Sequence, residues 1–352
     1  MPNENLTRAQ EAQKDEFYTQ FEDIEKELNS YLELNPDVFR DKIVLLPCDD
    51  PEWSNFTKYF ALNFKHFGLK KLISTCYASE GATPIQPIRF VSKPPQYDVE
   101  KSKVKGKILV IERKGDADGI KMGELQWNYL DGDGDFRSPE ISKLRDEADI
   151  IITNPPFSLF REFLAWIVDA NKQFLIIGNM NAVTYKDVFP LIMKNKIWYG
   201  CTISSGDREF GVPEDYPLEA AGCRIDEKGN KFIRVKGVRW FTNIDHGRRH
   251  LPLPLMTMAD NLKFSRHTDL RDKHAYENYD NYNAIEVPYT DAIPADYEGA
   301  MGVPISFFDK YCPEQFEIIG LDRYVEDNPN YGHRFNLNGK EIYARILIRK
   351  KQ

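Results

Sequence analysis

The chain has few cysteines, and their spacing connects none of them. Five cysteines are scattered over 352 residues, and no two form a C-x-x-C pair. Disulfide frameworks and zinc sites use cysteines that cluster at regular spacings. We therefore expect a reducing compartment, no disulfide framework and no metal site.

Long apolar runs and a hydrophobic leader are also missing. No apolar stretch approaches the roughly 20 residues that span a bilayer, and the first residues, Met1 to Gln13, are polar. The composition is 41% hydrophobic, which is ample for a full core in a chain of this length. We therefore expect a cytoplasmic protein that makes no membrane contact.

Negative charge predominates, which argues against a nucleic-acid partner if the charge is evenly spread. It is not, because between Ala220 and Ala275 twelve Lys and Arg residues oppose six acids. This segment carries +6, which leaves −14 for the rest of a chain whose total is −8. A basic module on an acidic body is typical of a DNA-reading region beside a catalytic domain. A solvated basic surface is the alternative.

Strand and helix patterns alternate through the first 196 residues. The expected strands cover 42–46, 71–76, 150–153 and 174–178, and the expected helices cover 11–34, 52–67, 159–170 and 188–196. Such units form a parallel sheet whose ligand crevice lies at the carboxyl ends of the strands. The pattern predicts an α/β fold with a doubly wound sheet.

Residues 78–126 interrupt this alternation. Prolines flank a short apolar stretch at 88–91, and the sequence K-I-L-V-I-E at 107–112 is a clear strand pattern. Two strands bounded by turn residues indicate a hairpin. We predict an insertion that protrudes from the edge of the sheet.

The loop at Asn154, Pro155, Pro156 and Phe157 follows a β-branched strand directly. Two prolines restrict the backbone, so the strand stops and a stiff, extended loop begins. The Asn154 amide oxygen and the Pro155 carbonyl accept hydrogen bonds, and Phe157 offers a flat apolar face. Together they suit a planar ring with an exocyclic amine, whose nitrogen becomes a better nucleophile when acceptors draw on its protons.

An aromatic ring in such a loop can hold a base that has rotated out of its stack. The alternative is a turn whose Asn154 caps the next helix while Phe157 lies in the core. The position after a buried strand and before a helical segment favours the functional interpretation.

The N-P-P-F sequence resembles the catalytic motif of amino-methyltransferases that use S-adenosylmethionine. Over most of its length the chain is similar to EcoRI-type adenine-specific DNA methyltransferases. The resemblance implies a Rossmann-like methyltransferase sheet with a C-terminal target-recognition region. Cofactor segments come first, the catalytic loop second and the basic module last, which resembles the gamma arrangement.

The same resemblance implies which residues bind S-adenosylmethionine. They lie in the sequences K-D-E-F-Y-T, C-D-D-P and G-D-F, and are Tyr18, Thr19, Cys48, Asp49, Asp50, Asp135 and Phe136. An Asx turn is the alternative for the two acids after the first strand. The chain departs from related patterns in two ways: this first loop has no glycine, and residues 74–77 lack the acid that often binds the ribose.

From the resemblance we expect a catalytic domain at 1–196, a basic target-recognition region at 197–300, and a segment at 301–352 that packs back on the catalytic domain. The DNA-binding candidates are Arg234, Lys236, Arg239, Arg248 and Arg249.

The expected reaction is methylation of the N6 amine of adenine in a specific double-stranded DNA sequence, with the base flipped into the N-P-P-F pocket. An RNA base, a protein glutamine amide and a non-catalytic DNA-binding relative are the alternatives. We expect a monomer associated with the nucleoid in a bacterium or a phage-infected cell, and a cognate restriction endonuclease in the same system.

Overall fold

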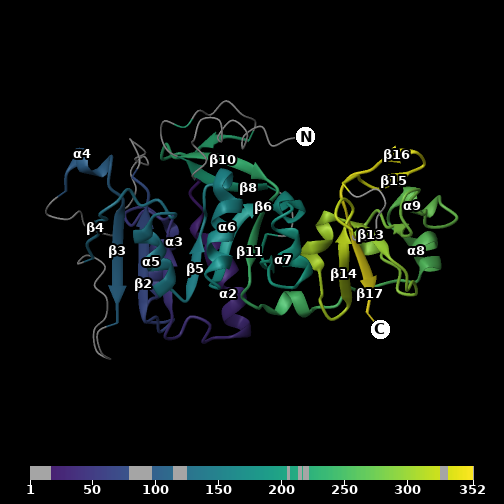
Figure 1. The fold of residues 1–352 in the computed structure, drawn as a ribbon, viewed down its shortest axis with the longest axis horizontal. Coiled ribbons are helices and arrows are strands. Elements are labelled where there is room, and N and C mark those ends of the chain that lie inside the picture. Colours follow the sequence, from purple (N-terminus) through teal and green to yellow (C-terminus); the bar gives the residue numbers. More distant parts are fainter. Residues whose placement is uncertain are drawn as a thin grey trace. The chain divides into compact units, whose positions relative to one another are not determined.

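The computed structural model describes residues 17–78, 97–113, 125–203, 207–212, 216, 222–325 and 332–351. The chain divides into two compact units (Figure 1). The first consists of Met1–Met180 and Gly200–Asp245, and the second of Asn181–Tyr199 and His246–Gln352. These units do not follow the boundaries expected at 196 and 300. This division does not test which segment is catalytic and which recognises the target, so the functional domains expected from the sequence stay predictions.

The first unit is built on a mixed sheet in which neighbouring strands follow the order β4-β3-β2-β1-β5-β6-β11. The central four strands are parallel, whereas β3, β4 and β11 pair antiparallel with their neighbours. The strands are β1 (Ile43–Leu46), β2 (Lys71–Cys76), β3 (Lys107–Glu112), β4 (Asn128–Tyr129), β5 (Ile150–Thr153), β6 (Gln173–Asn179) and β11 (Val238–Thr242).

Helices cover both faces of this sheet, as a doubly wound fold requires. Adjacent residues of a strand point to opposite faces. In β11, Trp240 lies 6.0 Å from Phe56 of α3, whereas Phe241 lies 5.0 Å from Phe160 of α6 (centroid distances). The helices of this unit are α2 (Phe21–Leu34), α3 (Asn55–Asn63), α4 (Val99–Ser102), α5 (Pro139–Glu147), η2 (Phe157–Leu159) and α6 (Phe160–Asp169).

The strand order places the switch point of the sheet between β1 and β5. The chain leaves β1 through α3 for β2 on one side, and leaves β5 through α6 for β6 on the other. The loops after β1 and β5 therefore diverge and leave a crevice, which is where open α/β sheets bind ligands.

A second sheet of the first unit has the order β8-β10-β9, with strands β8 (Asp207–Val212), β9 (Arg224–Ile225) and β10 (Lys231–Lys236). The segment before it is fixed to α2 by Glu27. This fully buried carboxylate accepts hydrogen bonds from the backbone N–H groups of Cys201 and Thr202, at 2.7 and 2.8 Å. Tyr18 also pairs with Gly211 of β8 through two backbone bonds of 2.9 Å.

The second unit has its own sheet, of order β12-β13-β17-β14, and a small hairpin, β15-β16. Its core includes Phe307 and Phe316, which are fully buried with ring centroids 5.3 Å apart. The predicted packing of 301–352 on the catalytic domain stays a prediction. The elements are α7 (Phe189–Met193), β7 (Trp198–Tyr199), η4 (Gly247–His250), α8 (Met258–Phe264), α9 (Thr268–Arg271), β12 (Ile285–Glu286), β13 (Met301–Pro304), η6 (Ile305–Lys310), β14 (Phe316–Leu321), β15 (Asn336–Leu337), β16 (Lys340–Glu341) and β17 (Arg345–Lys350).

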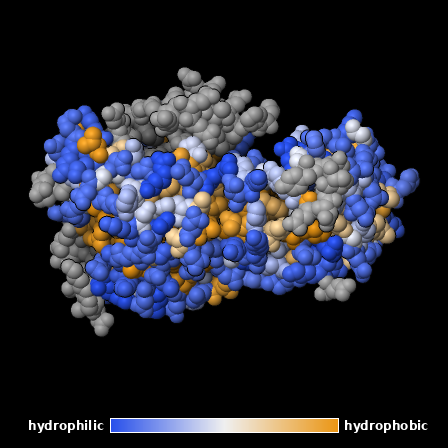
Figure 2. All heavy atoms as spheres, viewed as in Figure 1, coloured by the Kyte–Doolittle hydropathy of each residue, from blue (hydrophilic) through white to orange (hydrophobic). Residues whose placement is uncertain are grey.

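The expected strand at 107–112 is β3, which extends the sheet antiparallel to β2 along its whole length. The stretch at 88–91, expected to be its hairpin partner, lies outside the described residues. On the face shown in Figure 2 hydrophilic residues predominate, with apolar residues between them in small groups. Within the described ranges, none of the helices is long and apolar enough to cross a bilayer.

Candidate methyl-transfer site

A cavity of about 490 Å³ lies at the switch point of the first unit's sheet. This volume is within the usual range for sites that enclose a small molecule. Its wall combines the loops after β1 and β5, residues 17–19, and the segment before α5. The predicted site residues that line it are Tyr18, Thr19, Cys48, Asp49, Asp50, Asp135, Phe136, Asn154 and Pro156.

Asn154 follows β5 and lines the cavity, and a hydrogen bond from its amide nitrogen holds its side chain in place. Its Nδ2 donates to the Phe17 carbonyl at 2.7 Å. Its Oδ1 is buried, with no hydrogen-bond partner among the described residues. The helix-cap alternative is wrong for Asn154, because neither η2 nor α6 receives a side-chain cap. The structure therefore leaves a buried acceptor without a described partner on a residue that lines the cavity and is held by Phe17.

The rest of the N-P-P-F loop is divided between cavity and core. Pro156 lines the cavity, whereas neither Pro155 nor Phe157 is part of its described wall. Both are buried, and the Phe157 ring lies 5.6 Å from the Phe17 ring between centroids. Phe157 thus packs in the core, as the alternative interpretation of the loop expected.

Residues 17–19 form a strap at the cavity wall. Asn55 at the start of α3 donates from Nδ2 to the Thr19 carbonyl at 2.8 Å. The Thr19 hydroxyl is buried and has no hydrogen-bond partner in the described part of the chain. Thr19, like Asn154, thus lines the cavity and carries a buried oxygen without a described hydrogen-bond partner.

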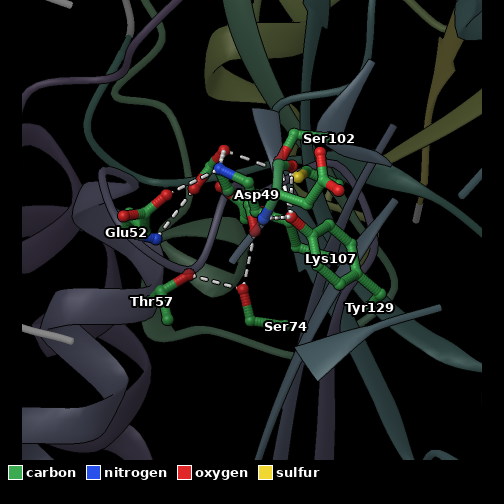
Figure 3. A network of polar contacts seen from close by, with 10 residues as sticks. Asp49, Glu52, Thr57, Ser74, Ser102, Lys107 and Tyr129 are labelled. Carbon is green, nitrogen blue, oxygen red and sulfur yellow. Dashed lines mark hydrogen bonds and ion pairs between the residues drawn. The ribbon is translucent and has the colours of Figure 1, made fainter. Parts of the chain in front are cut away.

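The two acids after β1 differ in their surroundings. The Asp49 side chain is buried and accepts from the hydroxyls of Ser54 and Thr153, both at 2.6 Å. Asp50 is more exposed, and its Oδ2 accepts from Lys107 Nζ at 2.8 Å. The same ammonium binds Glu52 Oε2 at 2.8 Å (Figure 3). Asp49 therefore ties the loop together, whereas Asp50 faces the cavity.

Gly134, Asp135 and Phe136 meet the cavity from the segment before α5. Gly134 has φ +85°, and a Cβ there would overlap the Cys76 carbonyl, so only glycine fits. Asp135 accepts from the Arg137 side chain, with Nε at 2.9 Å, and this bond lowers the pKa of Asp135. The carboxylate is therefore ionised and held in one orientation.

Sequence reasoning missed Arg137, Asn55 and Lys107. Arg137 and Asn55 line the cavity themselves, and Arg137 stands only two residues after Asp135, a spacing that could have suggested the pair. Lys107 had no such signal, because its place next to the loop depends on the register of β3 against β2.

The basic candidates fall in both units and differ in exposure. Arg234 and Lys236 are exposed on β10, and Arg248 is exposed on η4. Arg239 is buried and donates to the Val238 carbonyl. Arg249 is also buried, 3.5 Å over the Trp198 ring centroid. DNA contact by all five stays a prediction, and burial gives Arg239 and Arg249 packing contacts within the protein.

No cluster of His, Cys, Asp and Glu suited to a metal ion occurs among the residues that the structure describes. A mixed sheet with four parallel central strands, an N-P-P-F loop and a cavity at its switch point defines the protein as a Rossmann-like methyltransferase. The family follows from comparison with known proteins. A family model described as adenine-specific methyltransferase EcoRI matches residues 5–351, so the chain belongs to this family of adenine-specific DNA methyltransferases.

Curated relatives cover the chain almost completely. The type II methyltransferase M.EcoRI of Escherichia coli is 43% identical, over 99% of this chain and 97% of that protein. M.MpnI of Mycoplasma pneumoniae is 32% identical, over 99% and 98%. M.MgeORF184P of Mycoplasma genitalium is 31% identical, over 99% of both chains. No solved structure matches significantly. The expected fold class and enzyme class are confirmed.

Proposed function

We propose that the chain transfers a methyl group from S-adenosylmethionine to the N6 amine of an adenine that has rotated out of double-stranded DNA. One observation carries this proposal: Asn154 lines the cavity that the predicted cofactor residues line, and its buried Oδ1 is an acceptor without a partner among the described residues. Buried acceptors are nearly always paired, so an unpaired one on a residue that lines a cavity points to a ligand donor.

An exocyclic amine supplies that donor. Its protons bond to Asn154 Oδ1 and the Pro155 carbonyl, which leaves the nitrogen lone pair free to attack. Asn154 needs no movement, because its other end is tied to the Phe17 carbonyl. A base that stacks on Phe157 displaces the Phe17 ring, since the two rings are in contact. Orientation of aligned reactants contributes roughly 7–11 kcal/mol to such reactions.

The cavity suits S-adenosylmethionine, which supplies an electrophilic methyl group on a sulfonium. Asp135 is ionised and available to accept from an adenine amine, and Phe136 lies beside it in the lining. The Thr19 hydroxyl and the Asp50 carboxylate offer further polar contacts. Positions 48–50 thus hold the cofactor without the glycine-rich loop of dinucleotide folds.

The direct test is tritium transfer from labelled S-adenosylmethionine to duplex DNA, RNA or protein, with Asn154→Ala as the inactive control. We expect label in duplex DNA alone, in N6-methyladenine. Label in RNA or protein, or transfer by Asn154→Ala at the parental rate, contradicts the proposal.

Sequencing the genomic DNA of cells that express the chain, with detection of modified adenines, then gives the target sequence. The relatives are named type II methyltransferases, so a cognate restriction endonuclease is part of the proposal. The proposal also includes association with the nucleoid, since the proposed substrate is DNA. It further includes action as a monomer.

A further inference from the structure

The end of β2 raises a question about the cofactor ribose. In many nucleotide-binding sheets an acid at this point accepts from the ribose hydroxyls. Here the residues are Ser74, Thr75, Cys76 and Tyr77, none of them acidic. Cys76 and Tyr77 nevertheless line the cavity, as they should if the ribose lies there.

A carboxylate reaches the same point from the loop after β1. Asp50 Oδ2 accepts a hydrogen bond from Cys76 Sγ at 3.5 Å, so this carboxylate lies beside the last residue of β2. Its other oxygen, Oδ1, accepts from the Glu52 backbone N–H at 2.8 Å, which fixes the rotation of the group. Each carboxylate oxygen has two lone pairs. Oδ2 accepts from Cys76 and Lys107, whereas Oδ1 accepts from one donor and keeps capacity to accept from a ligand.

Lys107 holds this carboxylate in place. It lies directly opposite Cys76 in the β2–β3 register. Its ammonium lies 2.8 Å from both Asp50 Oδ2 and Glu52 Oε2, and its side chain is only 14% exposed. Lys107 and Glu52 are labelled in Figure 3. The ammonium also lies 5.1 Å from the Trp127 ring centroid. Burial by itself lowers the pKa of Lys107, but Asp50 and Glu52 outweigh it and raise the pKa, so the group is charged.

Asp49, the neighbouring acid, is less suited to this task. Its side chain is buried, and both of its oxygens already accept from hydroxyls of Ser54 and Thr153. Asp50 is 22% exposed and stands at the cavity edge.

We propose that Asp50 accepts hydrogen bonds from the ribose hydroxyls of the cofactor, in place of an acid on β2, and that Lys107 is the positioning residue that holds Asp50 there. This proposal rests on the proposed function, since it names the contact within the same cofactor site. In this proposal, strand β3 (Lys107–Glu112) contributes to cofactor binding through Lys107.

The test measures binding rather than turnover. Calorimetry compares the Kd of S-adenosylhomocysteine with that of its 2′,3′-dideoxy analogue, which lacks the hydroxyls. A hydrogen bond to a charged group predicts about 10- to 100-fold weaker binding of the analogue by the unaltered enzyme. In Asp50→Asn and Lys107→Met this ratio falls to about threefold or less, because the parent ligand loses its contact and the analogue had none. Lys107→Arg keeps the charge and restores part of the ratio.

Lys71→Met is the matched control. Lys71 begins β2 and pairs with Glu147 at 2.7 Å, with a side chain that is 17% exposed, but it lies outside the cavity wall. Its loss leaves the ratio unchanged. If Lys107→Met fails to fold, Asp50→Asn carries the test, because it leaves the Lys107–Glu52 ion pair intact.

The two proposals fail in different ways. If the unaltered enzyme binds neither S-adenosylhomocysteine nor the analogue, the proposed function is wrong. If it binds both but the ratio is near one, or if Asp50→Asn keeps the full ratio, the ribose contact is wrong while methyl transfer stands. If only Lys107→Met keeps the full ratio, the positioning role is wrong.

Discussion

The two sides of the cavity differ in how completely their polar atoms are paired. On the side of β1, Asp49 receives two hydroxyls and Asp50 receives Lys107. On the side formed by the β5 loop and the strap, Asn154 Oδ1 and Thr19 Oγ1 have no hydrogen-bond partner in the described ranges. Both carboxylates of the β1 side have partners within the protein, whereas the other side carries two buried oxygens without a described one.

This difference separates stability from function. A buried polar atom without a partner costs about 1–3 kcal/mol, so a fold keeps few of them. Paired groups stabilise the loop after β1 before any ligand binds. Unpaired groups stabilise only the state with ligand bound. We therefore expect substitution of the fully paired Asp49 to lower the free energy of unfolding, and substitutions on the unpaired side to lower binding or turnover.

The largest effect is expected from Asn154→Ala. Loss of one positioned hydrogen-bonding group lowers kcat about 10²- to 10³-fold in comparable sites. The free energy of unfolding should change by less than about 1 kcal/mol, because only the bond to Phe17 is lost. Single-turnover tritium transfer and urea unfolding measure the two quantities. If Asn154→Ala lowered the free energy of unfolding by several kcal/mol, the lost activity would reflect lost stability, and the distinction between the two sides would be wrong.

Asp49→Ala should have the opposite profile. It leaves the buried hydroxyls of Ser54 and Thr153 without their acceptor, and we expect the free energy of unfolding to fall by about 2–4 kcal/mol. Urea unfolding of the full chain measures the change. Asp37→Ala is the control, since this carboxylate is 64% exposed and should change stability by less than about 1 kcal/mol. Equal effects of both variants would contradict the role given to Asp49.

Asp322 shows what burial of a carboxylate costs in the second unit. Its Oδ2 has no hydrogen-bond partner among the described residues and lies 3.7 Å from Arg334 Nη1. Burial outweighs this ion pair and raises the pKa of Asp322 to about 6. Its stabilising contribution is full below the unfolded pKa near 4 and is lost as pH rises through 6. Unfolding at pH 4 and pH 8 should show that Asp322→Asn adds roughly 1–3 kcal/mol at pH 8 only. A gain of the same size at both pH values contradicts the assignment.

The smallest effect is expected from Thr19→Val. The hydroxyl has no partner to lose, so the free energy of unfolding should stay level or rise by less than about 1 kcal/mol. Binding of S-adenosylhomocysteine should weaken roughly 2- to 10-fold if the hydroxyl meets the cofactor. Thr57→Val is the matched control, since the Thr57 hydroxyl is bonded to Ser74 at 2.7 Å. That control should lower stability and leave Kd unchanged.

Local patterns in the sequence determined the strands and the chemistry of their loops. The runs at 71–76 and 150–153 are β2 and β5 as expected, because buried parallel strands read as short apolar or β-branched runs. Pro155 and Pro156 end β5 where two restricted residues must end it. The residues named for the cofactor all line one cavity, since loops at the carboxyl ends of neighbouring strands share an edge.

Only the tertiary structure decided which of these groups meet and how. Lys107 reaches Asp50 across 57 positions of the chain, and only the register of β3 against β2 brings them together. The same holds for the burial of Arg239 and Arg249, and for the division of the basic segment between two units. Charge and spacing are local properties of a sequence, whereas burial and pairing depend on segments far apart in it, so no single stretch contains them.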